Sequence, residues 1–336
     1  MTSALPASDA VDEHGYVPVI SLAGAHDPQR REKVARYLGD ALRRSGFYIV
    51  VDHDVPRYLF DRFYATALAF FRQPAAVKAA YGPVPGDLTR RGWTTRFRAA
   101  AGIGLETDED AAEAWTMNPY DPTLGWRNLV DLQPGVRAGI VHPNRFPPTP
   151  GFRAVLPYFL AMESQILTLL ALHATDLGLP IDYFARLCDQ PLTNLAANYY
   201  PRQHQAPADD SSCLGPHTDL GIMTALMHSG QRGLQVIDQD HPDRWVPVPN
   251  VPGGIVVNAG DELVLVSGGR YRSAYHRVVC PDNEERVSVP VFMQPGPDRV
   301  ITPACPPPLG ESGYEPLDSW EFFTRRMGIM YEGAGH

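Results

Sequence analysis

The segment GPHTDLGIMTALM (215–227) places two polar side chains, His217 and Asp219, at the start of an otherwise apolar run. In a β-strand, residues two apart point to the same face of the sheet, so both side chains could reach one point. The pair could bind a metal, form a catalytic pair, or be a chance pair at a strand entrance. What the rest of the chain offers decides between these three interpretations.

The chain after residue 193 consists of short apolar segments that are separated by turn signals, which predicts many short β-strands. The segments are TNLAANYYP, GIMTALMHS, GLQVID, WVPVPN, GGIVVNAGD, ELVLVSGG, AYHRVVCP and RVSVPVFMQP. Many short antiparallel strands are typical of a sandwich, a jelly roll or a barrel. In such folds, strands that are far apart in the sequence can lie side by side.

Helical periodicity surrounds this β region. It predicts helices at 28–46, 55–74, 151–180, 181–189 and 317–331, with strands at 17–22 and 47–53. Residues 82–150 are rich in Gly and Pro, and we expect long loops with short strands there, of the kind that often carries function. The fold class is therefore mainly β with α, and the long helix at 151–180 should lie against a sheet.

Composition excludes several classes of protein. Of the 336 residues, 44% are hydrophobic and 20% are charged, as in an ordinary soluble globular protein. The formal net charge of -9 argues against non-specific binding of nucleic acid and against basic membrane-surface patches. We find no apolar run that approaches the roughly 18 residues needed to span a bilayer, and no signal peptide at the N-terminus.

The cysteines indicate a cellular compartment. The chain has four, at positions 188, 213, 280 and 305, and none of them forms a CxxC motif. Wide spacing of this kind fits a reducing environment and argues against a zinc ribbon or a disulfide framework. We therefore expect a cytoplasmic protein.

His276, in the strand-like run AYHRVVC, is the best candidate for a third ligand beside His217 and Asp219. Several predicted strands separate it from that pair, and a jelly roll can bring such strands together. Two histidines and one carboxylate on one face of an octahedron suit non-haem Fe(II), because three positions stay open for O2 and a chelating cosubstrate. A bidentate 2-oxo acid is the kind of cosubstrate that could bind there.

Such a cosubstrate would bring a second carboxylate, which needs a cation deeper in the barrel. Arg286, in ERVSVPVF, offers a bidentate guanidinium that is always charged, and Ser288 faces the same way and adds a hydroxyl donor. An arginine in an otherwise apolar strand would be costly to bury without an anionic partner.

These motifs together resemble a known family. HTD, AYHRV and RVS, in this order, are similar to the HxD…H…RxS signature of the isopenicillin N synthase-like family of Fe(II)/2-oxoglutarate dioxygenases. The segments VPVISL, ALRRSGFYIVVDHDVP and ALAFFRQPAAVKAAY resemble the N-terminal region of that family, and NYYP (198–201) resembles its N-x-Y-P motif. The resemblance covers most of the chain and implies a double-stranded β-helix (jelly roll) core with N-terminal and C-terminal helices.

The resemblance also implies roles for single residues. It implies that the ligands of Fe(II) are His217, Asp219 and His276. It implies that the residues that bind 2-oxoglutarate are Arg286, Ser288, Tyr200 and Asn198, with the first two at its distal carboxylate. Phe292 would line the substrate side or pack beneath it.

A basic segment outside these motifs, LTRRGWTTRFR (88–98), resembles the RxGY or RRGF segment by which family members reach the substrate. Arg90 or Arg91 would hold a substrate carboxylate, with Trp93 as an apolar wall. The alternative is a basic surface loop. A carboxylate-bearing small molecule, such as an amino-acid-derived metabolite, is the predicted substrate class.

We divide the chain into four regions. They are a disordered lead-in (1–15), an N-terminal α/β region (16–150), a jelly-roll catalytic core with the long helix (151–300) and a C-terminal extension with a helix (301–336). The division near residue 190 separates helical from β sequence, but we expect the parts to share one core.

The predicted function is an Fe(II)- and 2-oxoglutarate-dependent oxygenase of specialised metabolism, such as antibiotic biosynthesis. It would hydroxylate a small molecule with O2 while 2-oxoglutarate is decarboxylated to succinate and CO2; desaturation or ring closure are alternative outcomes. One rival is an Fe(II) oxidase that closes a ring without 2-oxoglutarate. A rival of another class is a non-catalytic jelly-roll module with a structural metal, which a closed four-ligand site would support.

Overall fold

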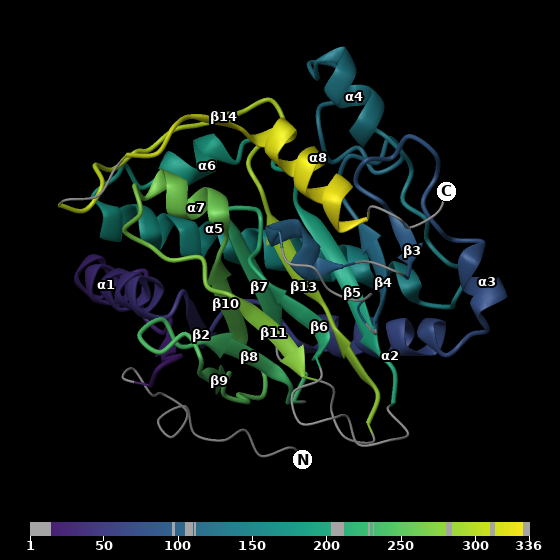
Figure 1. Ribbon diagram of the computed structural model, residues 1–336, viewed down its shortest axis with the longest axis horizontal. Coiled ribbons are helices and arrows are strands. Elements are labelled where there is room, and N and C mark those ends of the chain that lie inside the picture. The colour runs from purple at the N-terminus through teal and green to yellow at the C-terminus, as the bar shows by residue number, and fades with distance from the viewer. Residues whose placement is uncertain are drawn as a thin grey trace.

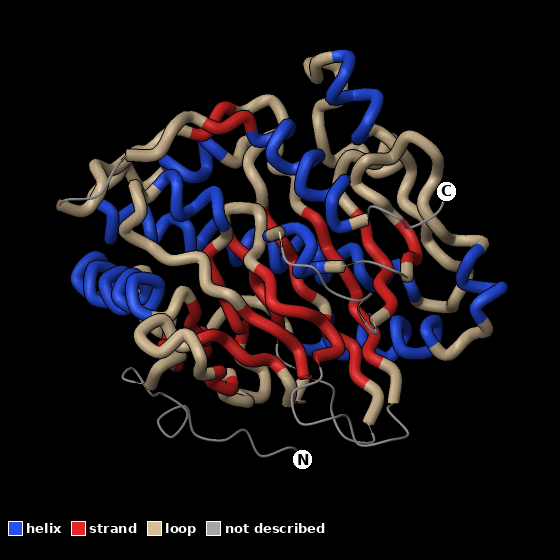
Figure 2. The backbone as a smooth tube through the Cα atoms, viewed as in Figure 1, coloured by secondary structure: helices blue, strands red, loops and turns tan. Residues whose placement is uncertain are grey.

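Two stacked β-sheets with helices around them form the molecule (Figures 1 and 2). The structure is a computed structural model of the chain, and it describes residues 15–95, 98–104, 110, 112–202, 212–227, 229–230, 232–279, 284–309 and 313–331. The predicted lead-in at 1–15 lies outside the described residues except for residue 15.

The larger sheet has the strand order β1-β2-β10-β7-β13-β5-β4-β3, and β12 pairs with β5 beside this path. Its strands are β1 (Val19–Ser21), β2 (Phe47–Val51), β3 (Gly92–Thr94), β4 (Glu113–Met117), β5 (Asn194–Tyr200), β7 (Met223–Met227), β10 (Ile255–Ala259), β12 (Arg286–Ser288) and β13 (Pro290–Met293). Strands β1 to β4 come from the N-terminal region, so this region and the core share one sheet.

The smaller sheet has the order β6-β11-β8-β9 and is antiparallel throughout. Its strands are β6 (Ser212–His217), β8 (Leu234–Ile237), β9 (Trp245–Pro247) and β11 (His276–Val279). A further two-stranded sheet joins β14 (Val300–Ile301) to β15 (Leu317–Asp318). The larger sheet is antiparallel except for the parallel pair β1–β2. Two facing, mainly antiparallel sheets of short strands are the arrangement that the sequence predicts for a jelly roll.

The helices cover the larger sheet and one end of the molecule. They are α1 (Pro28–Arg44), α2 (Arg57–Phe71), α3 (Ala75–Ala79), α4 (Pro134–Ile140), α5 (Val155–Leu177), α6 (Tyr183–Leu187), α7 (Asp261–Val266) and α8 (Ser319–Met330), with 3-10 turns η1 (Ala99–Ile103) and η2 (Phe152–Ala154). Helices α1, α2, α5, α6 and α8 confirm the five predicted helices. Each is shorter than predicted, α1 only at its C-terminal end.

Side-chain alternation in the larger sheet separates two layers. In β10, Ile255 and Val257 belong to the main hydrophobic core, which also includes the buried residues of α1, α2 and α5. The intervening Val256 points to the other face and packs with Val236 of the smaller sheet. The larger sheet therefore shows one face to the helices and the other to the space between the sheets, where polar side chains can gather.

Helix α5 corrects the expectation that no apolar segment is long enough to span a membrane. The helical segment Phe152–Leu177 has a mean hydropathy of 1.6 in its most apolar window, which is long and apolar enough to span a membrane by length and composition. Tyr158, Met162 and Ile166 are fully buried in the main core. The apolar character of α5 is thus explained by its place against the sheet.

The segment ELVLVSGG is predicted to be a strand, and this prediction is wrong because Asp261–Val266 forms α7. A short continuous apolar run does not distinguish a buried strand from a buried helix. Gly260 supplies an extended N-cap, and Asp261 and Glu262 stand in the first turn, where negative charge favours a helix.

A disulfide bond also departs from the sequence prediction. Cys213, on β6, is disulfide-bonded, although the cysteine spacing argued for reduced thiols. Cys188 and Cys305 are free and buried. Cys213 lies on the same strand as His217.

Candidate active site

His217 and His276 are brought together by the pairing of β6 with β11. His217 is the last residue of β6 and His276 is the first of β11, and the two are direct partners in the antiparallel register. Their ring centroids lie 4.2 Å apart. The two histidines are far apart in the sequence, but the pairing of β6 with β11 places them side by side.

Asp219 completes the cluster, but not in the way that the sequence analysis expects. It lies in the loop after β6 and not on a strand, so the alternation of strand residues does not place it. Its Oδ1 is 3.9 Å from Nε2 of His217 and 3.7 Å from Nε2 of His276. One ligand atom from each of the three residues lies within 4.8 Å of the others, as a shared metal ion requires.

Backbone carbonyls fix both imidazoles in one orientation. Nδ1 of His217 lies 2.8 Å from the carbonyl oxygen of Gly215, and Nδ1 of His276 lies 3.1 Å from that of Ala274. A carbonyl only accepts, so each Nδ1 carries the proton and each Nε2 keeps its lone pair. Both lone pairs are thus on the nitrogens that face Asp219, which is the pattern of a metal-ligating histidine.

Two side chains that the sequence analysis missed orient Asp219. Thr224 Oγ1 donates to Asp219 Oδ2 at 2.6 Å, and Asn258 Nδ2 donates to the same oxygen at 2.7 Å. Thr224 and Asn258 are partners in the β7–β10 register. The signal was one polar residue in each of two apolar strands, MTALM and IVVNA, which only a partner inside the fold explains.

Electrostatics keep the cluster ready for a cation. Burial by itself would raise the pKa of the Asp219 carboxyl, but His276, His217 and the two hydrogen bonds lower it overall. Burial and the neighbouring His276 lower the pKa of His217 to about 4. At neutral pH the site therefore holds a carboxylate and a neutral imidazole, which are the protonation states that bind metal.

Arg286 lies between the sheets, and its side chain is buried away from solvent. Its side chain is 4% exposed, and Nε and Nη1 have no hydrogen-bond partner within the described chain. Burial lowers the pKa of its guanidinium. An unpartnered buried guanidinium is costly, so the site fits a ligand that brings a carboxylate.

The register of β5 with β12 sets the surroundings of Arg286. Tyr200 is opposite Arg286 and Asn198 is opposite Ser288. The Arg286 guanidinium carbon lies 5.2 Å from the centroid of the Tyr200 ring. These four residues, with both histidines and Asp219, line one cavity of about 60 Å³. A small dicarboxylic acid would meet the metal ligands at one end and Arg286 at the other.

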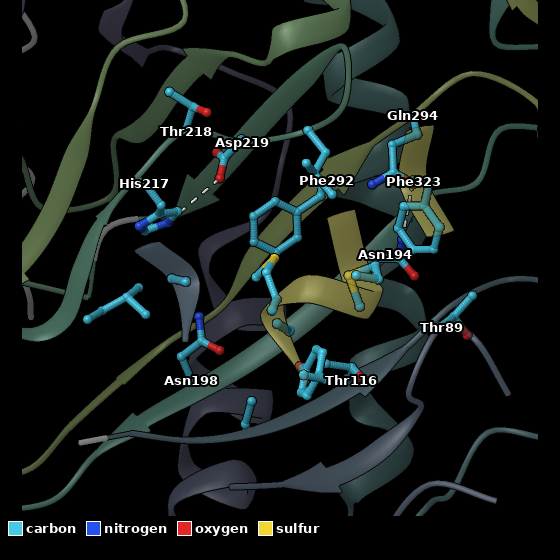
Figure 3. Close-up of a pocket in the computed structure, with 18 residues that line it drawn as sticks. Thr89, Thr116, Asn194, Asn198, His217, Thr218, Asp219, Phe292, Gln294 and Phe323 are labelled. Atoms are coloured by element: carbon cyan, nitrogen blue, oxygen red, sulfur yellow. Dashed lines mark hydrogen bonds and ion pairs between the residues drawn. The ribbon is translucent and has the colours of Figure 1, made fainter. Parts of the chain in front are cut away.

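A second cavity, of about 150 Å³, opens from the metal ligands on the other side (Figure 3). His217 and Asp219 line one end of it, Phe292 stands in the middle, and Gln294, Asn194 and Phe323 lie at the far end. The three-residue set thus leaves an open side, which distinguishes it from a closed structural metal site.

Comparison with known proteins agrees with this geometry. Residues 192–295 match the 2OG-Fe(II) oxygenase superfamily, and residues 17–148 match the N-terminal region described as "non-haem dioxygenase in morphine synthesis N-terminal". The proline hydroxylase buaE of Petromyces alliaceus is 31% identical over 319 residues, which cover 89% of this chain and 94% of that protein.

The chain belongs to the 2OG-Fe(II) oxygenase superfamily.

Further relatives widen the picture. A bi-functional coumaroyl CoA and feruloyl CoA ortho-hydroxylase of Ipomoea batatas is 28% identical over 93% of this chain and 79% of its own. The structure of JOX2 in complex with 2OG, Fe and JA has a TM-score of 0.72 at 26% identity and covers 98% of this chain and 90% of that chain. A full-length Neurospora crassa protein in complex with alpha-KG has a TM-score of 0.79 at 22% identity, covers 95% of this chain and 98% of that chain, and shows the shared fold.

The family membership, the jelly-roll fold class and the use of Fe(II) and 2-oxoglutarate are thereby confirmed. In this oxygenase, His217, Asp219 and His276 are the residues that would hold the metal. Arg286, Ser288, Tyr200 and Asn198 surround the place where 2-oxoglutarate would fit, and their roles there remain predictions that their positions agree with.

The substrate residues predicted for this oxygenase separate into two groups. Phe292, on β13, lines both cavities, so it is where the sequence analysis puts it. Arg91 does not line either cavity, contrary to the prediction. Its side chain is 0% exposed, and its Nε donates to Asp87 at 2.8 Å. Its other nitrogens donate to Asn118 and to the carbonyl of Ile140. The guanidinium therefore stabilises the loop and has no nitrogen left to bind a substrate.

Trp93 also lies away from the cavity. It pairs with Trp115 across β3 and β4, whereas the cavity is lined by the alternate β4 residues Ala114 and Thr116. Its Nε1 donates to Glu113 at 2.7 Å. Side chains alternate between faces, so Trp93 faces away from the cavity and its predicted role as a wall is wrong.

Arg90 lies at the edge of the cavity. Its guanidinium carbon is 4.9 Å from the centroid of the Tyr331 ring, and Tyr331 lines the cavity. Its backbone carbonyl accepts from Thr116, another lining residue. Of the two candidate arginines in this segment, Arg90 is the one in contact with residues that line the cavity.

Proposed function

We propose that this oxygenase hydroxylates an unactivated C–H bond of a small organic molecule held in the cavity next to His217 and Asp219, in specialised metabolism. The observation that carries the proposal is the position of the three metal-ligand atoms between two cavities, one ending at the unpartnered Arg286 and the other open for a substrate. One cavity suits the cosubstrate, and the other suits the molecule to be oxidised.

Bound Fe(II) and 2-oxoglutarate supply the oxidising power, because decarboxylation of 2-oxoglutarate to succinate and CO2 is coupled to the activation of O2. The protein supplies the rest. Thr224 and Asn258 hold Asp219, while the carbonyls of Gly215 and Ala274 hold the imidazoles, so the ligand set is preorganised. Phe292 stands between the two cavities and limits where a substrate carbon can come to rest.

Helix α8 supplies one side of the substrate cavity through Phe323, Met327 and Met330. These apolar side chains exclude water from the space next to the metal ligands, which protects a reactive centre from side reactions. Arg90, beside Tyr331, would meet a carboxylate of the substrate at the edge of the cavity, as the sequence predicts for this segment.

The test is anaerobic addition of Fe(II) and then 2-oxoglutarate to the purified protein, with the weak visible metal-to-ligand charge-transfer band as the readout. We expect the band in the wild type, its loss in Asp219→Ala, and at least a roughly tenfold weaker 2-oxoglutarate affinity in Arg286→Met. Arg299→Met, at a partly exposed arginine outside both cavities, is the matched control and should behave like the wild type.

Turnover separates the rivals. Formation of succinate that depends on Arg286 supports the oxygenase. An iron-loaded wild type with no band and no succinate would favour an oxidase that takes all electrons from its substrate. If the protein bound no iron at all, both the oxygenase and the oxidase proposals would be wrong.

A further inference from the structure

The substrate cavity is a slot between a sheet and a helix. Its floor on β5 is formed by Asn194, Ala196 and Asn198, which are two residues apart and therefore share one face of the strand. Thr116 of β4 is the cross-strand partner of Ala196 and extends the floor. Phe323, Met327 and Met330 of α8 line the slot as well, and Phe323 lies at its far end (Figure 3).

The slot runs along β5 from the metal ligands to a polar far end. Asn198 lines both cavities and so marks the metal end, whereas Asn194 lines only the substrate cavity. Four residues of extended strand span about 13 Å. A substrate that reaches Asn194 while one of its carbons lies near His217 is therefore larger than a single ring.

The far end carries two carboxamides that bind each other. Asn194 Nδ2 donates to Gln294 Oε1 at 3.3 Å (Figure 3). This bond uses one donor and one acceptor, and it leaves the Gln294 amide as a donor and the Asn194 oxygen as an acceptor. If both amides were flipped, the bond would reverse and again leave one donor and one acceptor. The pair thus offers at least one donor and one acceptor to a ligand.

The position of this amide pair is set by the backbone. Gln294 is 5% exposed and follows Phe292, the cross-strand partner of Asn194. Gly221 packs against it so closely that a Cβ there would lie 2.7 Å from Gln294 Cγ. A buried amide held in this way is costly unless its remaining hydrogen-bonding groups are satisfied when water is displaced.

The slot offers no counter-charge to a buried ion. Among the described residues that line it, Asp219 is the one that carries a formal charge, and Asp219 is committed to the metal. Beside the imidazole of His217, the remaining polar groups are the carboxamides and hydroxyls of Asn194, Asn198, Gln294, Thr89, Thr116, Thr218 and Tyr331. A charged group pushed to the far end would be desolvated without a partner.

We propose that the inner end of the substrate is an uncharged lactam or equivalent cis-amide edge, whose C=O accepts from Gln294 and whose N–H donates to Asn194. Cyclic dipeptides and fused-ring lactams have this edge, and both are long enough to place a C–H bond near the metal ligands. The proposal rests on the proposed function, since it assigns the substrate of that same site. A carboxylate, where the substrate has one, lies at the outer edge beside Arg90.

The test compares two probes on the metal-free protein by calorimetry or saturation-transfer NMR. The first is 2-quinolone, and the second is N-methyl-2-quinolone, which keeps the ring and the carbonyl but lacks the N–H. We expect the wild type to bind 2-quinolone at least about fivefold more tightly. In the double variant Asn194→Val/Gln294→Met, which removes both amides together, the preference should fall below about twofold.

Gln73→Met, the same replacement at an exposed helix end, is the control and should keep the preference. No binding of 2-quinolone, equal binding of both probes by the wild type, or tighter binding of quinoline-2-carboxylate than of 2-quinolone would each overturn the proposal. A preference that survives in the double variant would overturn it too. The measurement uses no iron, so a failed charge-transfer band and a failed lactam preference are separate results.

Discussion

Asn258 donates to one oxygen of Asp219 at 2.7 Å and thereby leaves the other oxygen, Oδ1, as the atom nearest to both imidazoles. Thr224 binds the same Oδ2, so the carboxylate cannot rotate without losing two hydrogen bonds. The metal-ligand geometry is therefore determined as much by two neutral side chains as by the ligands themselves.

Replacement of Asn258 by Ala tests this relationship. We expect Fe(II) affinity to fall by about 10- to 100-fold, because the carboxylate loses a fixed orientation while all three ligands remain. Titration of the metal-free protein with Fe(II) under anaerobic conditions measures the change. Asn250→Ala, at an exposed asparagine, is the control. Unchanged affinity in Asn258→Ala would show that Thr224 and the fold alone orient Asp219.

His173 makes the stability of the protein depend on pH. It is buried in α5, where Tyr48 and Tyr271 contact its two ring nitrogens, and burial together with Arg43 lowers its pKa to about 3. The unfolded chain takes up a proton at this residue near pH 6.5. Stability from the neutral imidazole is thus complete above about pH 6.5 and is lost as the pH falls towards 3.

Denaturant unfolding at pH 7 and at pH 5 checks this expectation. The free energy of unfolding of the wild type should fall by roughly 1–2 kcal/mol more than that of His173→Leu over this interval. His241→Leu, at an exposed histidine, should follow the wild type. Equal pH dependence in the wild type and His173→Leu would contradict the assignment.

Arg326 ties α8 to the body of the protein. Its Nη1 lies 3.2 Å from Asp261 Oδ2 on α7, and both side chains are largely buried. Loss of this bond in Arg326→Met should loosen α8 and raise amide hydrogen exchange along it by about tenfold. Arg325→Met removes a neighbouring exposed arginine and should leave the exchange of α8 unchanged. Equal exchange in both variants would mean that apolar packing alone holds the helix.

Gly221 is expected to tolerate no side chain. A Cβ there would lie 2.4 Å from the carbonyl oxygen of Met293, which is backbone and cannot easily move. Gly221→Ala should therefore lower the free energy of unfolding by about 1–3 kcal/mol. Gly328→Ala in α8, where a Cβ meets nothing within 4 Å, should be neutral or stabilising by up to about 1 kcal/mol. Thermal or denaturant unfolding measures the stability of both variants. Equal stability of Gly221→Ala and the wild type would contradict the prediction.

The sequence predicted the parts of the site that depend on residue type. A histidine and a carboxylate two apart, a later histidine, and an arginine with a serine are rare enough in strands that their order points to one chemistry. The structure brings His217, Asp219 and His276 together, and it buries Arg286 with Nε and Nη1 lacking a hydrogen-bond partner among the described residues. A buried polar side chain needs a reason, and that requirement can be read before any fold is known.

The sequence could not predict the features that depend on the direction in which a side chain points, because residue type alone does not determine that direction. Arg90 and Arg91 are adjacent and chemically identical, yet one reaches the edge of the cavity and the other is enclosed by Asp87 and backbone carbonyls. Similarly, ELVLV reads equally well as a strand or a helix, and Gly260 with the contacts of the buried Glu262 decides for α7. Only tertiary packing resolves such choices.

The division of labour between strands and helix α8 bears on how such an enzyme can change over evolutionary time. The residues that would hold metal and cosubstrate stand on β5, β11 and β12 and around the end of β6. The cavity-lining residues Phe323, Met327 and Met330 all belong to helix α8. Mutations in that helix can alter which molecule is accepted while the oxidising machinery is inherited intact. One scaffold can in this way diversify its chemistry towards new compounds by revising a short stretch of amino acids.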